Sequence, residues 1–164
     1  MKAVVVGGGL AGCEAAWALA ERGVAVTLYE MRPKTATPAH KTDRLAELVC
    51  SNTFKSTEIT NAHGLLKAEL ATLGSLLMSI AQETRVPGGA ALAVDRSDFS
   101  SAVTQHIQRH PGISVERREI TSLPSPAIVA TGPLTSDALA EVIRRRLGQD
   151  ALAFYDSIAP IVSG

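Results

Sequence analysis

The sequence contains little cysteine, few aromatic residues and no net charge. It has 2 cysteines among 164 residues, 4% aromatic residues, and 16 Lys and Arg against 16 Asp and Glu. Two cysteines without a neighbouring Cys or His at ligand spacing exclude a disulfide framework and a zinc site, and they favour a reducing, cytoplasmic setting. Zero net charge is atypical of a surface that attracts nucleic acid as a whole, so we expect any RNA contact to be local.

Long hydrophobic runs are absent too. A membrane span needs roughly 18 consecutive apolar residues, and the longest uncharged candidate, 70–82, is shorter than that. We therefore predict a soluble protein without a membrane contact. A hydrophobic fraction of 46% excludes a disordered chain, and the length predicts one domain over residues 1–164.

The beginning of the chain predicts a β-α-β unit. Residues 2–6 are a β-branched run ended by three glycines, as expected of a buried parallel strand. An alanine-rich helix over 10–22 follows, with Gly23 as its stop, and then an alternating strand over 24–29.

Residues 31–63 lose this regular pattern. They are rich in Thr, Pro, Ser and Lys and mildly positive, so we interpret them as an irregular insertion, either a functional loop or a solvated surface excursion. A helix is expected over 64–82, because five apolar residues recur on one helical face and predict core packing. These residues are Leu66, Leu70, Leu73, Leu77 and Ile80.

Strands and helices alternate over the rest of the chain. We expect strands over 90–94, 113–117 and 127–130, and candidate strands over 151–155 and 158–162. Asp95 caps a helix that ends at 110–112, and Thr135 or Ser136 begins a helix that runs to Leu147. The alternation predicts an α/β fold, a Rossmann-like parallel sheet, whole or in part, with helices on both faces.

The strongest local signal is a G-x-G-x-x-G turn between the first strand and the first helix. The turn consists of Gly7, Gly8, Gly9, Leu10, Ala11 and Gly12. In this motif the first glycine permits a tight turn, the second lets a pyrophosphate approach the backbone, and the third lets helix and strand pack closely. The helix N-terminus offers unpaired N–H groups to the phosphates. We therefore predict a dinucleotide-binding site in preference to a mere glycine-rich turn.

Residues at two other strand ends bear on which dinucleotide binds. Glu30 ends the second strand, where a carboxylate accepts hydrogen bonds from a ribose 2′-hydroxyl and repels a 2′-phosphate, which favours FAD or NAD over NADP. Arg32 could reverse this preference by pairing with a phosphate, which is the less favoured interpretation. Thr131 and Gly132 follow an apolar strand in an Ala-Thr-Gly segment. That segment resembles the one that flavoproteins with two dinucleotide domains place beside FAD, and it favours FAD over NAD.

Cys50 is the candidate nucleophile. It lies in the positive irregular segment, where neighbouring Lys and Arg favour a reactive thiolate, although a lone Cys beside Leu and Val is more often a buried structural thiol. Cys13, on the first helix, is interpreted as a packing residue. His40 could bind phosphate or shuttle protons, whereas the other three histidines form no constellation and are interpreted as surface or capping residues.

Several segments together resemble one protein family. These segments are 7–17, 29–33, 37–40, 42–43, 46–52, 64–67, 91–96, 130–136, 155–156 and 160–162. They resemble the folate- and FAD-dependent tRNA uracil-5 methyltransferases, the TrmFO family, which is related to the GidA flavoproteins. The glycine-rich turn is common to many flavoproteins, whereas 46–52 and 130–136 are far more specific.

The resemblance implies methylation of the T-loop uridine of tRNA at C5. The carbon would come from methylenetetrahydrofolate, and reduced FAD, regenerated by NAD(P)H, would be the reductant. By the same resemblance Cys50 would be the thiol that adds to uracil C6, and a second family cysteine would lie beyond residue 164. Cys13 stands where the family usually has Ser, and Lys55 where it usually has Arg.

The length departs most from the family pattern. Family members are well over twice as long, so the resemblance implies the N-terminal portion of a longer flavoenzyme. Two other functions stay open: a paralogue that methylates rRNA, and a non-catalytic or truncated FAD-binding fragment. The sequence leaves open the oligomeric state, the choice between NADH and NADPH, and the residues that hold folate.

Overall fold

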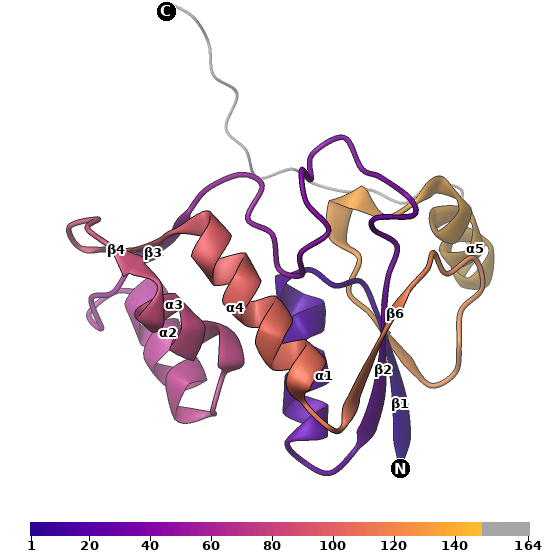
Figure 1. The fold of residues 1–164 in the computed structure, drawn as a ribbon, viewed down its shortest axis with the longest axis horizontal. Helices are drawn as coiled ribbons and strands as arrows, with labels where there is room; N and C mark the ends of the chain where they lie inside the picture. The colour runs from indigo at the N-terminus through magenta and orange to yellow at the C-terminus, as the bar shows by residue number, and fades with distance from the viewer. Residues whose placement is uncertain (149–164) are drawn as a thin grey trace, which may run out of the picture.

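Two sheets of different kind organise residues 1–148, the part of the chain that the computed structural model describes (Figure 1). The larger sheet is parallel throughout and has the strand order β6-β2-β1-β7. Its strands are β1 (Lys2–Val6), β2 (Ala25–Glu30), β6 (Ile113–Arg117) and β7 (Ala127–Val129). The smaller sheet is antiparallel, with the order β3-β5-β4. Its strands are β3 (Thr53–Ser56), β4 (Arg85–Val86) and β5 (Ala91–Val94).

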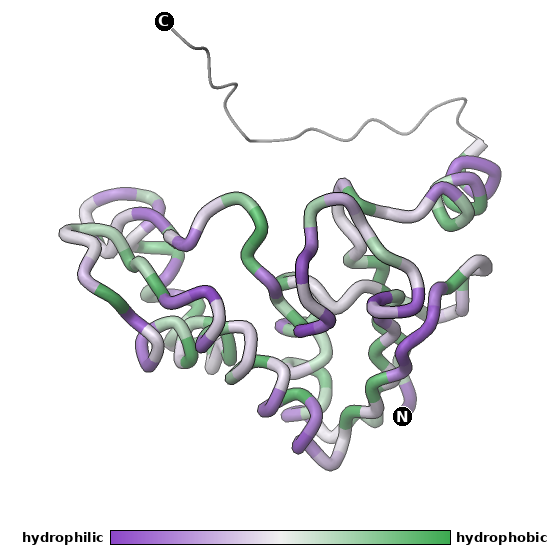
Figure 2. The backbone as a smooth tube through the Cα atoms, turned by 45° about the horizontal axis from the view of Figure 1, so that its top comes forward, coloured by the Kyte–Doolittle hydropathy of each residue, from purple (hydrophilic) through white to green (hydrophobic). Residues whose placement is uncertain are grey.

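Helices cover both faces of the parallel sheet. Helices α1 (Leu10–Ala20) and α4 (Arg96–Arg109) pack on the face to which Val5 and Leu28 point, and they form the main core with it. Helix α5 (Asp137–Leu147) lies on the other face, where Leu139 packs with Val6. Side chains alternate between the faces of a strand, which is why consecutive valines serve different cores. The predicted parallel sheet with helices on both faces is therefore confirmed, and Figure 2 shows green, hydrophobic stretches in the part of the backbone close to the N-terminus.

The helix predicted over 64–82 is two helices, so that prediction is wrong. Helix α2 (Ala62–Thr72) ends before Gly74, which adopts φ +80°, and α3 (Leu76–Glu83) begins after Ser75, whose side chain accepts a hydrogen bond from the Met78 amide. The two helices meet at 109°. Glycine tolerates a positive φ and serine is a favoured N-cap, so this pair both stops one helix and starts the next.

The break removes part of the predicted leucine stripe from the core. Leu77 and Ile80 of α3 are buried, whereas Leu66 is 54% exposed and Leu73 is 71% exposed. Within residues 1–148 no single helix is long and apolar enough to cross a membrane; α2 and α3 reach the required length and composition only together, across their bend.

Two other sequence predictions need correction. Residues 31–63 are not irregular throughout, because they include β3 and the first residues of α2. The strand expected at 90–94 forms as β5, but it pairs in the antiparallel sheet and not in the parallel one. Alternation of strands and helices cannot reveal a second sheet, since short strands pair by tertiary contact. The candidate strands at 151–155 and 158–162 lie outside the described residues.

Candidate functional site

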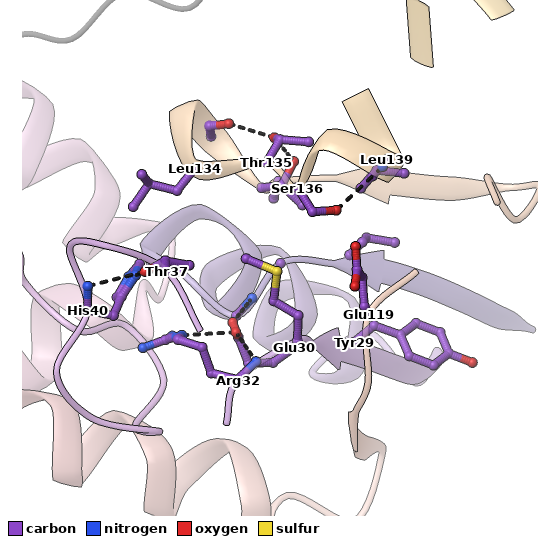
Figure 3. A pocket seen from close by; sticks show the side chains of 18 of the residues that line it. Tyr29, Glu30, Arg32, Thr37, His40, Glu119, Leu134, Thr135, Ser136 and Leu139 are labelled. Atoms are coloured by element: carbon purple, nitrogen blue, oxygen red, sulfur yellow. Dashed lines mark hydrogen bonds and ion pairs between the residues drawn. The ribbon is translucent and has the colours of Figure 1, made fainter. Parts of the chain in front are cut away.

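A cavity of about 320 Å³ opens where the four parallel strands end. Its walls come from the residues that follow each strand: 7–11 after β1, 29–32 at the end of β2, 118–120 after β6 and 130–136 after β7. Figure 3 shows Leu134 to Ser136 on one side of it and Glu30, Arg32 and His40 on the other. The carboxyl edge of an open parallel sheet, at the point where successive connections diverge, is where such folds bind ligands. The volume lies at the lower end of the range, about 300 to 1,000 Å³, of small-molecule sites.

The glycine-rich turn, residues 7–12, leaves no room for side chains where it packs and ample room where it faces the cavity. A Cβ on Gly12 would lie 1.7 Å from the Gly7 carbonyl oxygen, and a Cβ on Gly7, which has φ +104°, would lie 2.6 Å from the Ala130 oxygen. A Cβ on Gly9 would meet nothing within 4 Å. Gly9 is the N-cap of α1 and no side chain of the described residues caps this helix. A pyrophosphate therefore fits here, against open backbone and unpaired N–H groups.

The two cofactor motifs predicted separately lie against each other. Strand β7 pairs with β1, and the Ala130 amide donates to the Val6 carbonyl oxygen at 2.7 Å. Thr131 and Gly132 thus reach the cavity beside the turn. The Thr131 and Thr135 hydroxyls are 2.6 Å apart, and Gly132 begins the 3₁₀ helix η1 (Gly132–Leu134) with φ +61°.

Glu30 is a buried carboxylate that accepts three hydrogen bonds, which leaves acceptor capacity on Oε2. Its Oε2 accepts from the Gly8 amide at 2.9 Å, and its Oε1 accepts from the amide and Nε of Arg32 at 2.9 and 3.0 Å. Burial by itself raises the pKa of Glu30, but the hydrogen bonds and charge of Arg32 and the Gly8 amide outweigh it, so this pKa lies below its ordinary value. Glu30 is therefore ionised at neutral pH, at the position where a ribose hydroxyl is expected.

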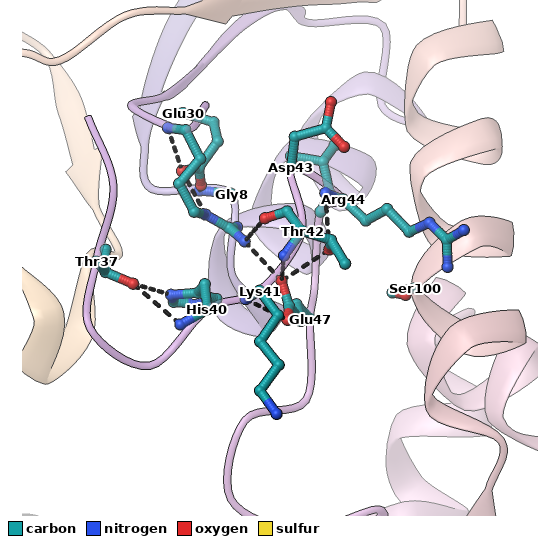
Figure 4. A network of polar contacts seen from close by, with 12 residues as sticks. Gly8, Glu30, Thr37, His40, Lys41, Thr42, Asp43, Arg44, Glu47 and Ser100 are labelled. Carbon is teal, nitrogen blue, oxygen red and sulfur yellow. Dashed lines mark hydrogen bonds and ion pairs between the residues drawn. The ribbon is translucent and has the colours of Figure 1, made fainter. Parts of the chain in front are cut away.

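Arg32 is bound to carboxylates. It is 3% exposed, and its Nη1 donates to Glu47 Oε2 and to the Thr42 carbonyl oxygen, both at 3.1 Å. Glu47 in turn accepts from the Lys41 amide and from the amide and hydroxyl of Thr42 (Figure 4). These interactions disfavour the interpretation in which Arg32 takes a phosphate.

The segment that carries Glu47 packs on the glycine-rich turn. The Ala46 amide donates to the Gly8 carbonyl oxygen at 2.8 Å, and Ala46 itself adopts φ 51°. Burial raises the pKa of Glu47, yet its hydrogen bonds to Lys41 and Thr42 outweigh that effect and lower it. Part of the predicted irregular insertion is therefore a fixed wall of the cavity.

His40 also lines this wall. Its Nδ1 lies 2.6 Å from the Thr37 hydroxyl, and both residues face the cavity (Figure 3). Burial and then the charge of Arg32 lower the pKa of His40, so the imidazole is neutral at pH 7. A neutral ring suits hydrogen bonding or proton transfer better than electrostatic binding of a phosphate.

The two cysteines occupy opposite environments. Cys13 is fully buried, its Sγ donates to the Gly8 carbonyl oxygen at 3.4 Å, and burial followed by the charge of Glu30 raises its pKa to about 12. Its interpretation as a packing residue is confirmed. Cys50 is exposed, and its neighbour in sequence, Val49, lines the cavity. Exposure contradicts the alternative that Cys50 is a buried structural thiol.

Sequence reasoning missed several residues of this site. Glu47 and Thr37 lie in a segment without periodicity, and the contribution of 118–120 depends on where the chain goes after β6. There the Arg118 guanidinium lies 4.8 Å from the centre of the Tyr29 ring. No local pattern signals the contact between Arg118 and Tyr29, because these two residues are remote in the chain. Among the described residues no group of three or more His, Cys, Asp or Glu could hold a metal ion.

Comparison with known proteins places this geometry in context. The family model described as "Glucose inhibited division protein A" matches residues 2–164. The methylenetetrahydrofolate–tRNA-(uracil-5-)-methyltransferase TrmFO of Aquifex aeolicus is 58% identical over 163 residues, which are 98% of this chain and 37% of that protein. The protein of the same name from Anoxybacillus flavithermus is 53% identical, over 99% of this chain and 38% of its own. The chain thus spans little more than a third of the length of these relatives.

Solved structures support the fold. The crystal structure of Aquifex aeolicus GidA superposes with a TM-score of 0.70 at 15% identity, over 88% of this chain and 30% of that one. The amino acid oxidase NikD, in its open form, superposes with a TM-score of 0.51 at 16% identity, over 85% of this chain and 52% of its own. At such identities these likenesses concern the fold alone.

Proposed function

The chain belongs to the glucose-inhibited division protein A family, and we propose that it is the FAD-binding part of an enzyme that methylates the T-loop uridine of tRNA at C5. The observation that carries the proposal is the cavity where the open glycine-rich turn, the Glu30 carboxylate and the Thr131 segment converge. The names of relatives at 53 to 58% identity give the reaction. In this proposal residues 1–164 are the N-terminal domain of a longer flavoenzyme.

Each element of the cavity has a task toward FAD. The backbone of the glycine-rich turn and the first N–H groups of α1 hold the pyrophosphate, because a helix N-terminus favours negative charge. Glu30 accepts a hydrogen bond from a ribose hydroxyl. Thr131 and Gly132 flank the same ligand from the opposite wall. The proposed FAD-binding residues are Gly7, Gly8, Gly9, Leu10, Ala11, Gly12, Glu30, Arg32, Thr131 and Gly132.

Cys50 is the proposed catalytic nucleophile. Uracil C5 becomes nucleophilic when a thiolate adds to C6, and the exposure of Cys50 lets an unstacked base of an RNA loop reach it. Methylenetetrahydrofolate would donate the carbon, and FAD, held by the glycine-rich turn and Glu30 and reduced by NAD(P)H, would supply the electrons that turn the methylene unit into a methyl group. Before that reduction, loss of the C5 proton would release tetrahydrofolate from the methylene unit, and the thiolate would leave C6 as the methyl group forms.

The remaining proposals follow from the substrate. With tRNA as its substrate, we expect the enzyme to act in the cytoplasm. We expect RNA to be contacted by cationic side chains that are not already paired with carboxylates of the protein. In the segment 31–55 Arg32 is buried among carboxylates, so exposed lysines such as Lys41 and Lys55 are the better candidates.

Flavin binding by the chain and 5-methyluridine formation by the complete enzyme test the proposal. We expect the purified chain to bind FAD, and we expect Cys50→Ala in the complete enzyme to abolish methylation of tRNA while FAD stays bound. The matched control Cys13→Ala, which alters a packing residue, should retain activity. A chain that takes up no flavin on reconstitution contradicts the FAD site, and a fully active Cys50→Ala enzyme contradicts the nucleophile. Methylation of rRNA in place of tRNA would identify the paralogue.

A further inference from the structure

Three charged side chains form a chain along one wall of the cavity. Arg32 Nε lies 3.0 Å from Glu30 Oε1, and Arg32 Nη1 lies 3.1 Å from Glu47 Oε2. These side chains are 4%, 7% and 14% exposed for Arg32, Glu30 and Glu47. One guanidinium faces two carboxylates, so this ion-pair chain carries a net negative charge. Because it is largely out of water, that charge acts on a ligand in the cavity with little screening.

Glu47 fixes one end of the ion-pair chain to the backbone of its own segment. Its Oε1 accepts from the Lys41 amide at 2.9 Å, and its Oε2 accepts from the Thr42 amide and hydroxyl at 3.1 and 2.8 Å (Figure 4). A carboxylate held by three donors of its own segment cannot follow Arg32 if the guanidinium moves. Glu47 therefore keeps Arg32 in place.

The position of Arg32 matters for nucleotide choice. An arginine near the end of the second strand of such a fold can pair with a 2′-phosphate. Here its Nε and Nη1 already donate to carboxylates and to the Thr42 carbonyl oxygen. Arg117, from β6, approaches the same segment, but its Nη1 donates to the carbonyl oxygens of Arg32 and Asp43 at 3.3 and 2.6 Å.

We propose that Glu47 is a specificity-determining residue of the nucleotide site: through Arg32 it makes the site accept adenosine with a free 2′-hydroxyl and reject a 2′-phosphate. The inference rests on the proposed FAD site. It gives that site a means to exclude NADPH, which carries a 2′-phosphate and which the proposed reaction admits as reductant. Glu47 acts by position and charge and takes no part in the chemistry.

The ratio of two affinities tests this role. The flavin-free protein is titrated with 5′-ADP and with adenosine 2′,5′-bisphosphate, as the unmodified chain and as the isosteric variant Glu47→Gln. We expect the unmodified chain to prefer 5′-ADP by roughly tenfold or more, and Glu47→Gln to reduce that preference by at least about threefold, as the loss of one nearby charge predicts. If the role of Glu47 were merely structural, the substitution would weaken the binding of both ligands alike and leave the ratio of their affinities unchanged. The control Glu21→Gln alters a glutamate paired with His110 at the other end of α1 and should keep the ratio.

Two results overturn the inference: no preference for 5′-ADP in the unmodified chain, or an unchanged ratio in Glu47→Gln. If Glu47→Gln loses its circular dichroism, the milder Thr42→Val, which removes one hydrogen bond to Glu47, must reduce the ratio in the same direction. Failure of the proposed function has a different signature, since the unmodified chain would then bind neither FAD nor 5′-ADP, and the inference falls with it.

Discussion

The carboxyl edge of the parallel sheet and helix α2 are built on different principles. At the sheet edge, glycines sit in contact with neighbouring backbone, and Glu30, Arg32 and Glu47 satisfy one another. In α2, by contrast, Leu65 and Leu66 are half exposed and only Gly64 is buried. The geometry of the cavity is therefore fixed by close backbone contact and paired charge, whereas α2 has few contacts that a substitution would break.

Gly12→Val should break the sheet edge most severely. A Cβ at this position would lie 1.7 Å from the Gly7 carbonyl oxygen, so the turn or the helix must move. We expect the free energy of unfolding to fall by about 4 kcal/mol or more, measured by urea denaturation. The control Gly9→Ala adds a methyl group with nothing within 4 Å. It should lower the free energy of unfolding by no more than about 1 kcal/mol, since alanine is a poorer N-cap than glycine, yet weaken nucleotide binding, because the methyl group occupies the phosphate approach. Equal stability losses in both variants would contradict the close backbone contact at Gly12 and the open space at Gly9.

Arg32→Met should have the next largest effect, because it leaves two carboxylates along the cavity wall without their cation. Removing one partner of a buried ion pair costs about 3 to 5 kcal/mol. The same denaturation experiment on Arg145→Met, whose Nε pairs with Glu141 on the exposed surface of α5, should show a loss below about 1 kcal/mol. If both substitutions lower the free energy of unfolding equally, the ion pairs of the cavity wall contribute no more to stability than a surface pair.

Leu77→Ala and Leu73→Ala sharpen the contrast within the leucine stripe itself. Leu77 is 7% exposed and Leu73 is 71% exposed, although their spacing would place them on one face of a continuous helix. Truncation should lower the free energy of unfolding by about 2 to 4 kcal/mol at Leu77 and by less than about 0.5 kcal/mol at Leu73. Comparable losses in the free energy of unfolding would support the continuous helix predicted from the sequence and contradict the break at Gly74.

A pH titration of stability should show the smallest effect. The pKa of Glu30 is lower in the folded protein than in the unfolded chain, so its ionisation stabilises the fold above the unfolded pKa. That contribution is lost as the pH falls from about 5 through the folded pKa. Urea denaturation between pH 7 and pH 3.5 should therefore show a steeper decline for the unmodified chain than for Glu30→Gln. Parallel curves would indicate that Glu30 titrates normally.

Local patterns predicted the β-α-β unit because its contacts are close in sequence. The valine run of β1 and the glycines of the turn each act within a few residues, and a parallel strand buried on both faces has a distinctive composition. Glu30 could be placed at the cavity for the same reason, since the length of α1 brings β2 back beside β1. The exposure of Cys50 had no such signal.

The patterns misled where a local stop and a long periodicity competed. Leucines continue at helical spacing through Gly74 and Ser75, and the periodicity concealed a glycine stop followed by a serine cap. The antiparallel sheet was missed because β4 has only two residues and β3 lies in a polar segment. Strands that short form through their partners, not through their own composition.

The sequence by itself determined that the chain has a glycine-rich turn after its first strand, a carboxylate at the end of the second strand and a parallel α/β core. Each follows from residue types whose backbone preference or burial acts over a few residues. Only the tertiary structure decided that Arg32 is held between Glu30 and Glu47, that Thr131 lies against the turn, and that one cysteine is buried and the other exposed. Those outcomes depend on contacts between remote segments. A side chain becomes buried, or pairs with a charge, only once folding has brought those segments together.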